Sequence, residues 1–227
     1  MFKKLLVLSG VTLLYLFLGA EVHGQQMWFA NRFRLKMLDE RLRLTLNTQL
    51  RLENRLRDYD RAFVEPRIAW KFGDVAKLRF NYRYSDRSTT FGAEEQPQDD
   101  EYRLSGDLFL YYEIDDSDWE LQTRFRFQHE REVDETDYDQ VIRGRLKGTY
   151  DLTNKSDIYA SAELFYPVND DDAWQLDGWR ITTGLESELS DKVLLTTFYR
   201  MERNRDDRLW QTAYILGIYL EYDFELD

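Results

Sequence analysis

Hydrophobic and polar residues alternate along most of the chain, in runs of about ten residues. In the clearest run, even-numbered positions from Leu42 to Leu52 are apolar except for Thr48, whereas odd-numbered positions from Arg43 to Glu53 are polar. Because successive side chains of a β-strand point to opposite faces, this pattern predicts a strand with one apolar and one polar face. No segment after Gln26 has a helical period of apolar residues, so the sequence predicts an all-β protein.

Eleven such runs follow one another. The phase of the tenth run is ambiguous, because Leu194, Leu195, Phe198 and Tyr199 place apolar residues on both faces. The predicted strands are 28–37, 42–54, 62–72, 76–85, 101–114, 119–130, 140–152, 156–167, 175–189, 193–203 and 209–225.

The connections between these runs alternate in length. A barrel built this way has tight turns at one rim and loops at the other, as outer-membrane barrels do. The short turns are 38–41, 73–75, 115–118, 153–155 and 190–192, and the longer acidic loops are 55–61, 86–100, 131–139, 168–174 and 204–208.

Alternation alone does not say which face is inside, so a soluble lipocalin-like barrel is an alternative. Strands of about ten residues suit a tilted membrane crossing. Tryptophans at the run ends predict interfacial girdles at both rims, and long charged side chains in mid-strand predict a charged lumen. The expected girdle residues are Trp28, Trp70, Trp119, Trp174 and Trp210, and the expected lumen residues are Arg79, Arg124, Arg126, Arg143, Arg145, Glu163, Arg180 and Glu186.

The strand count raises a problem of closure. Membrane-spanning sheets must close, because every backbone polar group needs a partner. An N-terminus and a C-terminus that both lie in the periplasm require an even number of strands. Three solutions stay open: twelve strands with one run holding two, ten strands with 28–37 outside the wall, or eleven strands with one parallel closure and an N-terminus that crosses the lumen.

Composition narrows the function classes. The 227 residues carry a net charge of −12, which argues against nucleic-acid binding because phosphates would be repelled. With no cysteine, the chain has no disulfide, thiolate metal site or cysteine nucleophile. A mean hydropathy of −0.65 excludes a helical-bundle membrane protein.

The first 24 residues are predicted to be a secretory signal peptide. Lys3 and Lys4 precede an apolar stretch, 5–19, that is too short for a typical membrane-spanning helix. We expect cleavage between Gly24 and Gln25, which leaves residues 25–227 as the outer-membrane barrel.

Two hairpins carry a resemblance to a known family. They begin with Trp28-Phe-Ala-Asn-Arg-Phe-Arg-Leu-Lys-Met and with Phe63-Val-Glu-Pro-Arg-Ile-Ala-Trp-Lys-Phe, and arginine follows the apolar alternation in both. The chain resembles the uncharacterised outer-membrane barrel family catalogued as domain of unknown function 2490. The resemblance implies a bacterial outer-membrane location and no established activity. The segment Tyr219-Leu-Glu-Tyr-Asp-Phe resembles an assembly signal for the barrel-insertion machinery, although Glu225-Leu-Asp follows it.

Catalytic and metal-binding motifs are weak. His129 is the one histidine after the signal peptide, and no serine lies near it in sequence, so an ordinary histidine at the rim is favoured over a catalytic one. The acidic segments 134–139 and 170–172 lack the spacing of a calcium loop. We therefore predict no catalytic residue, no metal and no cofactor.

The sequence thus predicts an all-β, antiparallel up-and-down transmembrane β-barrel of ten to twelve strands in the bacterial outer membrane. A non-enzymatic role with a charged lumen that is narrow or closed is favoured. The alternatives are a small-solute or ion pore, a lipid-modifying enzyme, a surface binding module and a soluble periplasmic carrier. The expected partners are outer-membrane lipids and, during insertion, the barrel-assembly machinery.

Overall fold

The computed structural model describes residues 25–53, 58–87, 100–133, 136–169, 175–206 and 209–226. The predicted signal peptide lies outside these residues. Within the described ranges, no helix is long and apolar enough to cross a membrane. The strands are β1 (Gln25–Met37), β2 (Leu42–Glu53), β3 (Asp58–Phe72), β4 (Ala76–Arg87), β5 (Glu101–Glu113), β6 (Trp119–Glu132), β7 (Asp139–Thr153), β8 (Ser156–Pro167), β9 (Gly178–Ser190), β10 (Val193–Asp206) and β11 (Leu209–Glu225).

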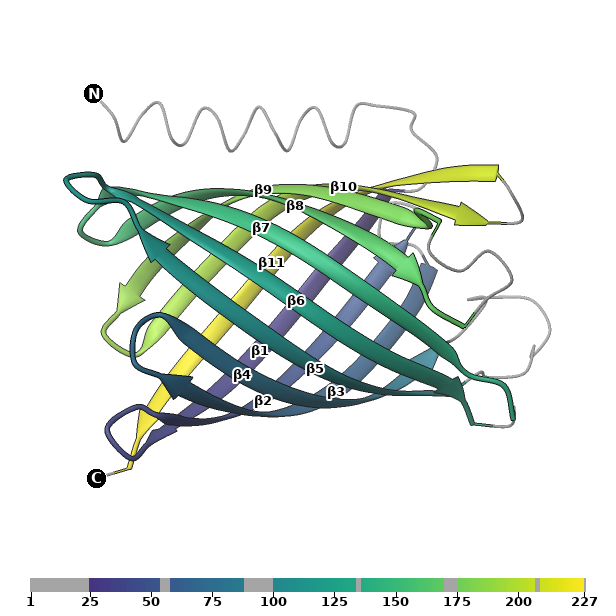
Figure 1. Ribbon diagram of the computed structural model, residues 1–227, viewed down its shortest axis with the longest axis horizontal. Helices are drawn as coiled ribbons and strands as arrows, with labels where there is room; N and C mark the ends of the chain where they lie inside the picture. Colours follow the sequence, from purple (N-terminus) through teal and green to yellow (C-terminus); the bar gives the residue numbers. More distant parts are fainter. Residues whose placement is uncertain are drawn as a thin grey trace.

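These eleven strands form one closed barrel (Figure 1). Each strand pairs antiparallel with the next, whereas β1 and β11 pair in parallel from Gln25↔Tyr214 to Lys36↔Glu225. Parallel closure follows from the odd count, because the first and last strands of an up-and-down barrel then run in the same direction. Of the three predicted solutions, eleven strands with a parallel closure is confirmed. The proposed passage of the N-terminus through the lumen concerns residues outside the described ranges.

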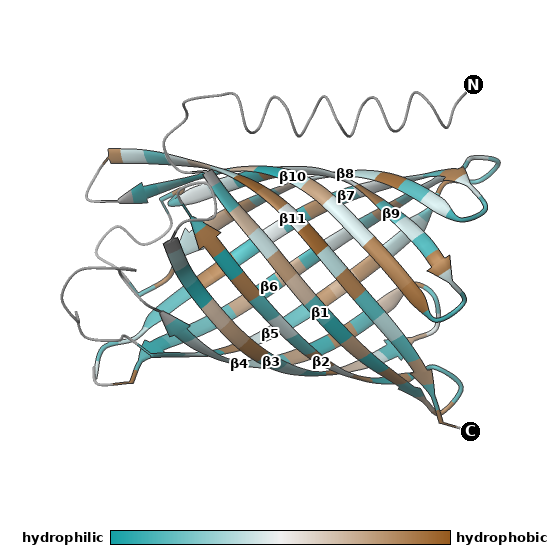
Figure 2. Cartoon of the chain, turned by 180° about the vertical axis from the view of Figure 1, so that it is seen from behind, coloured by the Kyte–Doolittle hydropathy of each residue, from teal (hydrophilic) through white to brown (hydrophobic). Residues whose placement is uncertain are grey.

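The barrel is polar inside and apolar outside. Of the described residues other than glycine that are buried, seventeen are polar or charged and eight are apolar. Large apolar side chains are exposed even in mid-strand, as at Phe80, Leu146 and Ile181. Along individual strands, hydrophobic and hydrophilic positions alternate (Figure 2). The alternation in the sequence therefore corresponds to outward apolar and inward polar faces.

An aromatic cluster covers the inner face of the parallel closure. Trp28 of β1, Phe198 of β10 and Ile215 of β11 pack together and are almost fully buried, and Tyr219 packs against them. Parallel pairing is slightly less stable per residue than antiparallel pairing. The cluster adds apolar packing where the sheet closes. It also resolves the phase of β10, where Phe198 points inward and Tyr199 stacks on Tyr214 on the outer face.

The turn between β1 and β2 holds an unusual backbone. Leu38, Asp39 and Glu40 all have positive φ angles of 53–64°, a region that glycine usually occupies. Two cations hold Glu40 in place, with Lys36 Nζ 3.2 Å and Arg43 Nη2 2.9 Å from its carboxylate. The hydrogen bond from Lys36 lowers the pKa of the Glu40 carboxyl below its ordinary value.

Candidate functional site: a cationic lumen

The barrel encloses a cavity of about 480 Å³ whose lining is strongly cationic. Fourteen arginines and two lysines line it, against five glutamates. The lining residues of each strand occupy alternate positions, so the cavity is lined by the polar faces of the amphipathic strands. The interior is therefore rich in positive charge although the whole chain is acidic.

A block of four arginines lies on β6 and β7. Arg124 is paired directly with Arg145, and Arg126 with Arg143, across the two strands. Like charges directly opposite each other destabilise a sheet unless counter-charges separate them. The neighbouring strands supply such counter-charges.

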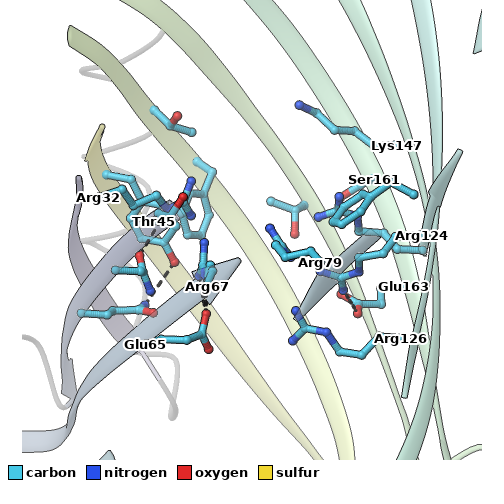
Figure 3. Close-up of a pocket in the computed structure, with 18 of the residues that line it drawn as sticks. Arg32, Thr45, Glu65, Arg67, Arg79, Arg124, Arg126, Lys147, Ser161 and Glu163 are labelled. Atoms are coloured by element: carbon cyan, nitrogen blue, oxygen red, sulfur yellow. Dashed lines mark hydrogen bonds and ion pairs between the residues drawn. The ribbon is translucent and has the colours of Figure 1, made fainter. Parts of the chain in front are cut away.

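Two buried carboxylates flank this block, Asp107 from β5 and Glu163 from β8. The Asp107 side chain is fully buried, with Oδ1 2.6 Å from Arg126 Nε and Oδ2 2.8 Å from Arg79 Nη2. On the other side, Glu163 Oε1 accepts a hydrogen bond from Arg143 Nε at 2.9 Å and another from Arg124. Figure 3 shows Arg79, Arg124, Arg126 and Glu163 on this side of the cavity. Glu163 also pairs with Arg180, at 3.7 Å.

A second group lies across the cavity, where Glu65 of β3 faces inward (Figure 3). Glu65 is 1% exposed and pairs with Arg67 at 2.5 Å and with Arg83 at 2.6 Å. The Arg83 guanidinium also lies 3.7 Å from the centre of the Phe63 ring. Here too a single buried carboxylate pairs with more than one guanidinium group.

Some cations in the lining have no carboxylate within 4.0 Å in the described part of the chain. Arg145 donates to Gln122 Oε1, and its Nε is buried without an acceptor. Lys77 Nζ lies over the Phe109 ring, 4.4 Å from its centre. Two further guanidiniums contact the Trp28 ring, those of Arg51 at 4.1 Å and Arg200 at 4.9 Å.

All eight residues predicted for the lumen line this cavity. Lys147 forms a 3.0 Å ion pair with Glu186, the second carboxylate of that prediction. Of the predicted girdle, Trp70, Trp119 and Trp210 lie on the outer face and are 38–46% exposed.

The prediction for Trp28 is wrong. Its side chain is 4% exposed, lines the cavity and donates from Nε1 to Gln26 Oε1. Trp28 shares the phase of Arg32 and Arg34, so the period-2 pattern itself places it inside. Whether a tryptophan faces the lumen or the outside is therefore indicated better by the phase of its strand than by its position at the strand end. Trp174 lies outside the described residues.

Sequence reasoning missed the buried carboxylates that organise the arginines. Asp107 and Glu65 were not singled out, although both occupy the polar phase of their strands. Such a carboxylate can be recognised as an acidic residue that has inward-facing arginines beside it on adjacent strands. Recognising it requires the strand register, which the hydropathy pattern does not give.

The other candidates lie apart from this cavity. His129 lies on the outer phase of β6, with its ring 5.0 Å from that of Tyr138. Among the described residues, no three acidic or histidine side chains come together to hold a metal ion. Residues 134, 135 and 170–172 of the acidic segments lie outside the described ranges.

Comparison with known proteins gave one family. The sequence model of "Protein of unknown function (DUF2490)" matches residues 25–213. A search of curated proteins gave no match.

Solved structures with a similar trace include OmpT of Vibrio cholerae, at 11% identity and a TM-score of 0.40. That match covers 74% of this chain, which spans 57% of the length of OmpT. The translocator domain of the autotransporter NalP from Neisseria meningitidis matches at 15% identity and a TM-score of 0.36, over 76% of this chain and 71% of that domain.

Proposed function

The chain belongs to the DUF2490 family of unknown function, and from this premise we propose that it is an outer-membrane β-barrel whose charged lumen is too narrow for large solutes. The observation that carries the proposal is the inverted distribution of polarity in a closed barrel, with arginines inside and large apolar side chains outside.

The outer face favours a hydrocarbon environment. Phe80 is 62% exposed and Leu146 and Ile181 are each 53% exposed, all in the middle of strands. Apolar surface in water costs about 25 cal/mol per Å², and soluble monomers rarely expose large contiguous apolar patches. A membrane around the barrel removes this cost, whereas a soluble carrier would retain it.

Aromatic side chains at both ends of the outer face support the same placement. At the rim of short turns, Trp119 packs against Tyr150 with ring centres 5.2 Å apart. At the rim of longer loops, Tyr102 packs against Tyr84 at 5.4 Å, and Trp210 is exposed. Amphipathic rings at two levels are typical of membrane interfaces.

This placement implies the remaining features of the proposal. The short turns face the periplasm and the longer loops face outward, as in other bacterial barrels. Residues 1–24 act as a removable signal peptide, the barrel-assembly machinery inserts the chain, and outer-membrane lipids surround it.

The narrowness of the lumen is supported by the side chains that enter it. Phe109, Tyr159 and Phe198 line the cavity together with the arginines. Barrel diameter grows with strand number, and eleven strands lie between filled eight-stranded barrels and porins with sixteen or more. Long side chains therefore fill much of the cross-section.

Cell fractionation and liposome swelling test the two parts of the proposal. We expect the protein in the outer-membrane fraction, and we expect proteoliposomes to exclude disaccharides. Recovery in the osmotic-shock fraction would favour the soluble carrier and overturn the membrane placement. Rapid swelling in disaccharides, or large solute-permeable conductance steps, would overturn the narrow lumen.

A small-ion pore is the second candidate, because the polar cavity of about 480 Å³ has room for hydrated ions. Planar-bilayer recording tests it. Discrete small conductance steps would establish the pore, and a silent barrel that still inserts would mean a sealed lumen.

A further inference from the structure

We propose that the lumen binds a small, water-soluble polyanion of the phosphate class through positive charge that the barrel's own carboxylates leave unneutralised. This inference rests on the proposed barrel lumen and names the class of ligand that it takes.

The first argument is the imbalance of charge. Sixteen cations line the cavity against five glutamates, and five described carboxylates outside the lining also pair with its cations: Glu40, Glu101, Asp107, Glu130 and Asp223. At least six cations therefore remain in excess, although the chain as a whole carries a net charge of −12. On β6 and β7 and their neighbours, Asp107 and Glu163 pair with five arginines. Confined charges of one sign repel strongly at low effective dielectric, and a buried charge without a partner is costly. A bound anion would relieve this excess.

The second argument is the presence of donors without acceptors. Arg145 lies opposite Arg124 on β6 and opposite Glu163 on β8, but it donates its side-chain hydrogen bond to neutral Gln122. Its Nε is buried and has no hydrogen-bond partner. Buried polar groups without partners are rare in native proteins and call for an explanation.

Lys77 is a second cation of this kind. Its ammonium lies 4.4 Å from the centre of the Phe109 ring and 5.2 Å from that of Tyr111, and in the described ranges no carboxylate lies within 4.0 Å of it. Arg79 and Arg43 repel it. Lys77 and Arg145 line the same cavity and lie in one row of register partners, because Lys77 pairs with Phe109, Phe109 with Arg124 and Arg124 with Arg145.

The chemistry of the donors selects the ligand class. Guanidinium groups present paired N–H donors that match the oxygens of carboxylate and of phosphate, whereas a halide offers no such pair of acceptors. Phosphate carries more charge and more acceptor oxygens per group than carboxylate, so it suits an excess of cations better. The cavity volume of about 480 Å³ falls within the range of small-molecule sites. A small phosphate compound satisfies both conditions.

Isothermal titration of the protein, purified from membranes in a neutral detergent, tests the proposal with inorganic pyrophosphate at constant ionic strength. We expect saturable binding at one site per chain. Arg145→Gln and Lys77→Gln should each weaken binding about tenfold, because a charge-assisted hydrogen bond contributes on the order of 1.4 kcal/mol or more. Neither substitution leaves a carboxylate without its partner, so both variants should keep the heat-modifiable migration of a folded barrel.

The matched control is Lys192→Gln, which removes the same charge at an exposed turn. It should bind pyrophosphate as the unaltered protein does. An equal loss in this control would mean a diffuse electrostatic effect and would overturn the site. Absence of saturation, or equally tight binding of chloride, would also overturn it.

A lipid headgroup carries the same phosphate chemistry. We therefore repeat the titration with phosphatidylglycerol in the micelles. Unchanged pyrophosphate binding supports a soluble ligand inside the barrel, and competition by the lipid overturns that assignment. Fractionation and swelling do not depend on this titration, so a narrow outer-membrane barrel that fails to bind pyrophosphate overturns only this inference.

Discussion

Glu163 shows how a single buried residue stabilises the arginine-rich interior. Its carboxylate is 3% exposed and pairs with Arg124, Arg143 and Arg180. Glu163→Gln should lower the free energy of unfolding by about 3 kcal/mol, because removing one partner of a buried ion pair leaves the others uncompensated. Urea unfolding in lipid vesicles measures the effect.

The control for Glu163→Gln is Glu225→Gln. The Glu225 side chain is 69% exposed, and its carboxylate lies 3.6 Å from Lys36 Nζ. Exposed ion pairs contribute little, so this variant should stay within about 0.5 kcal/mol of the unaltered protein. Equal stability of both variants would mean that water screens the interior charges.

A glycine on β11 makes a second prediction at this scale. Gly217 is paired with Phe198, whose ring occupies the space that a Cβ atom would take. Gly217→Ala should therefore destabilise the barrel by about 2 kcal/mol through overpacking. At Gly144 the same space is open, so Gly144→Ala should leave the unfolding midpoint almost unchanged. Equal midpoints for the two variants would contradict the packing shown at the closure.

At the scale of the strand, alternation alone was sufficient to predict the wall. The eighth and eleventh predicted runs coincide with β8 and β11, and β3 begins four residues before its prediction, at Asp58. That extension lies beside a loop, where polar residues interrupt the apolar phase. Which strands meet at the closure was not predictable, because pairing between β1 and β11 depends on the total count and on long-range geometry.

Disulfide cross-linking tests this closure directly, since the chain has no cysteine. Phe29 and Ile218 are register partners on the outer phase of β1 and β11. Cysteines at these two positions should form a bridge and change the mobility in non-reducing gels. The pair Phe29→Cys with Leu216→Cys should not, because a shift of two residues separates the Cα atoms by about 8 Å. The reverse result would place β11 in another register.

At the scale of the whole molecule, the directions of the strands predict an orientation. The turn that contains Asp74 lies at one rim, and the connection that contains Asp137 lies at the other. In bacterial barrels short turns face the periplasm, so the second rim should face outward. Asp74 and Asp137 are both exposed, so a single cysteine at either position can report which side of the membrane its rim faces. The chain has no cysteine of its own that would give background labelling.

A membrane-impermeant maleimide should label Asp137→Cys in intact cells, and it should label Asp74→Cys only after the outer membrane is permeabilised. Labelling of Asp74→Cys alone in intact cells would mean the opposite orientation. Labelling of neither variant in intact cells, with both labelled in the osmotic-shock fraction, would mean that the barrel is soluble in the periplasm.

The orientation also bears on the lumen, because the carboxylates Glu101 and Glu130 surround Arg103 near the loop rim. With the loops outward, an anion that enters from the medium passes these carboxylates before it reaches Arg145 and Lys77, which have no described carboxylate within 4.0 Å.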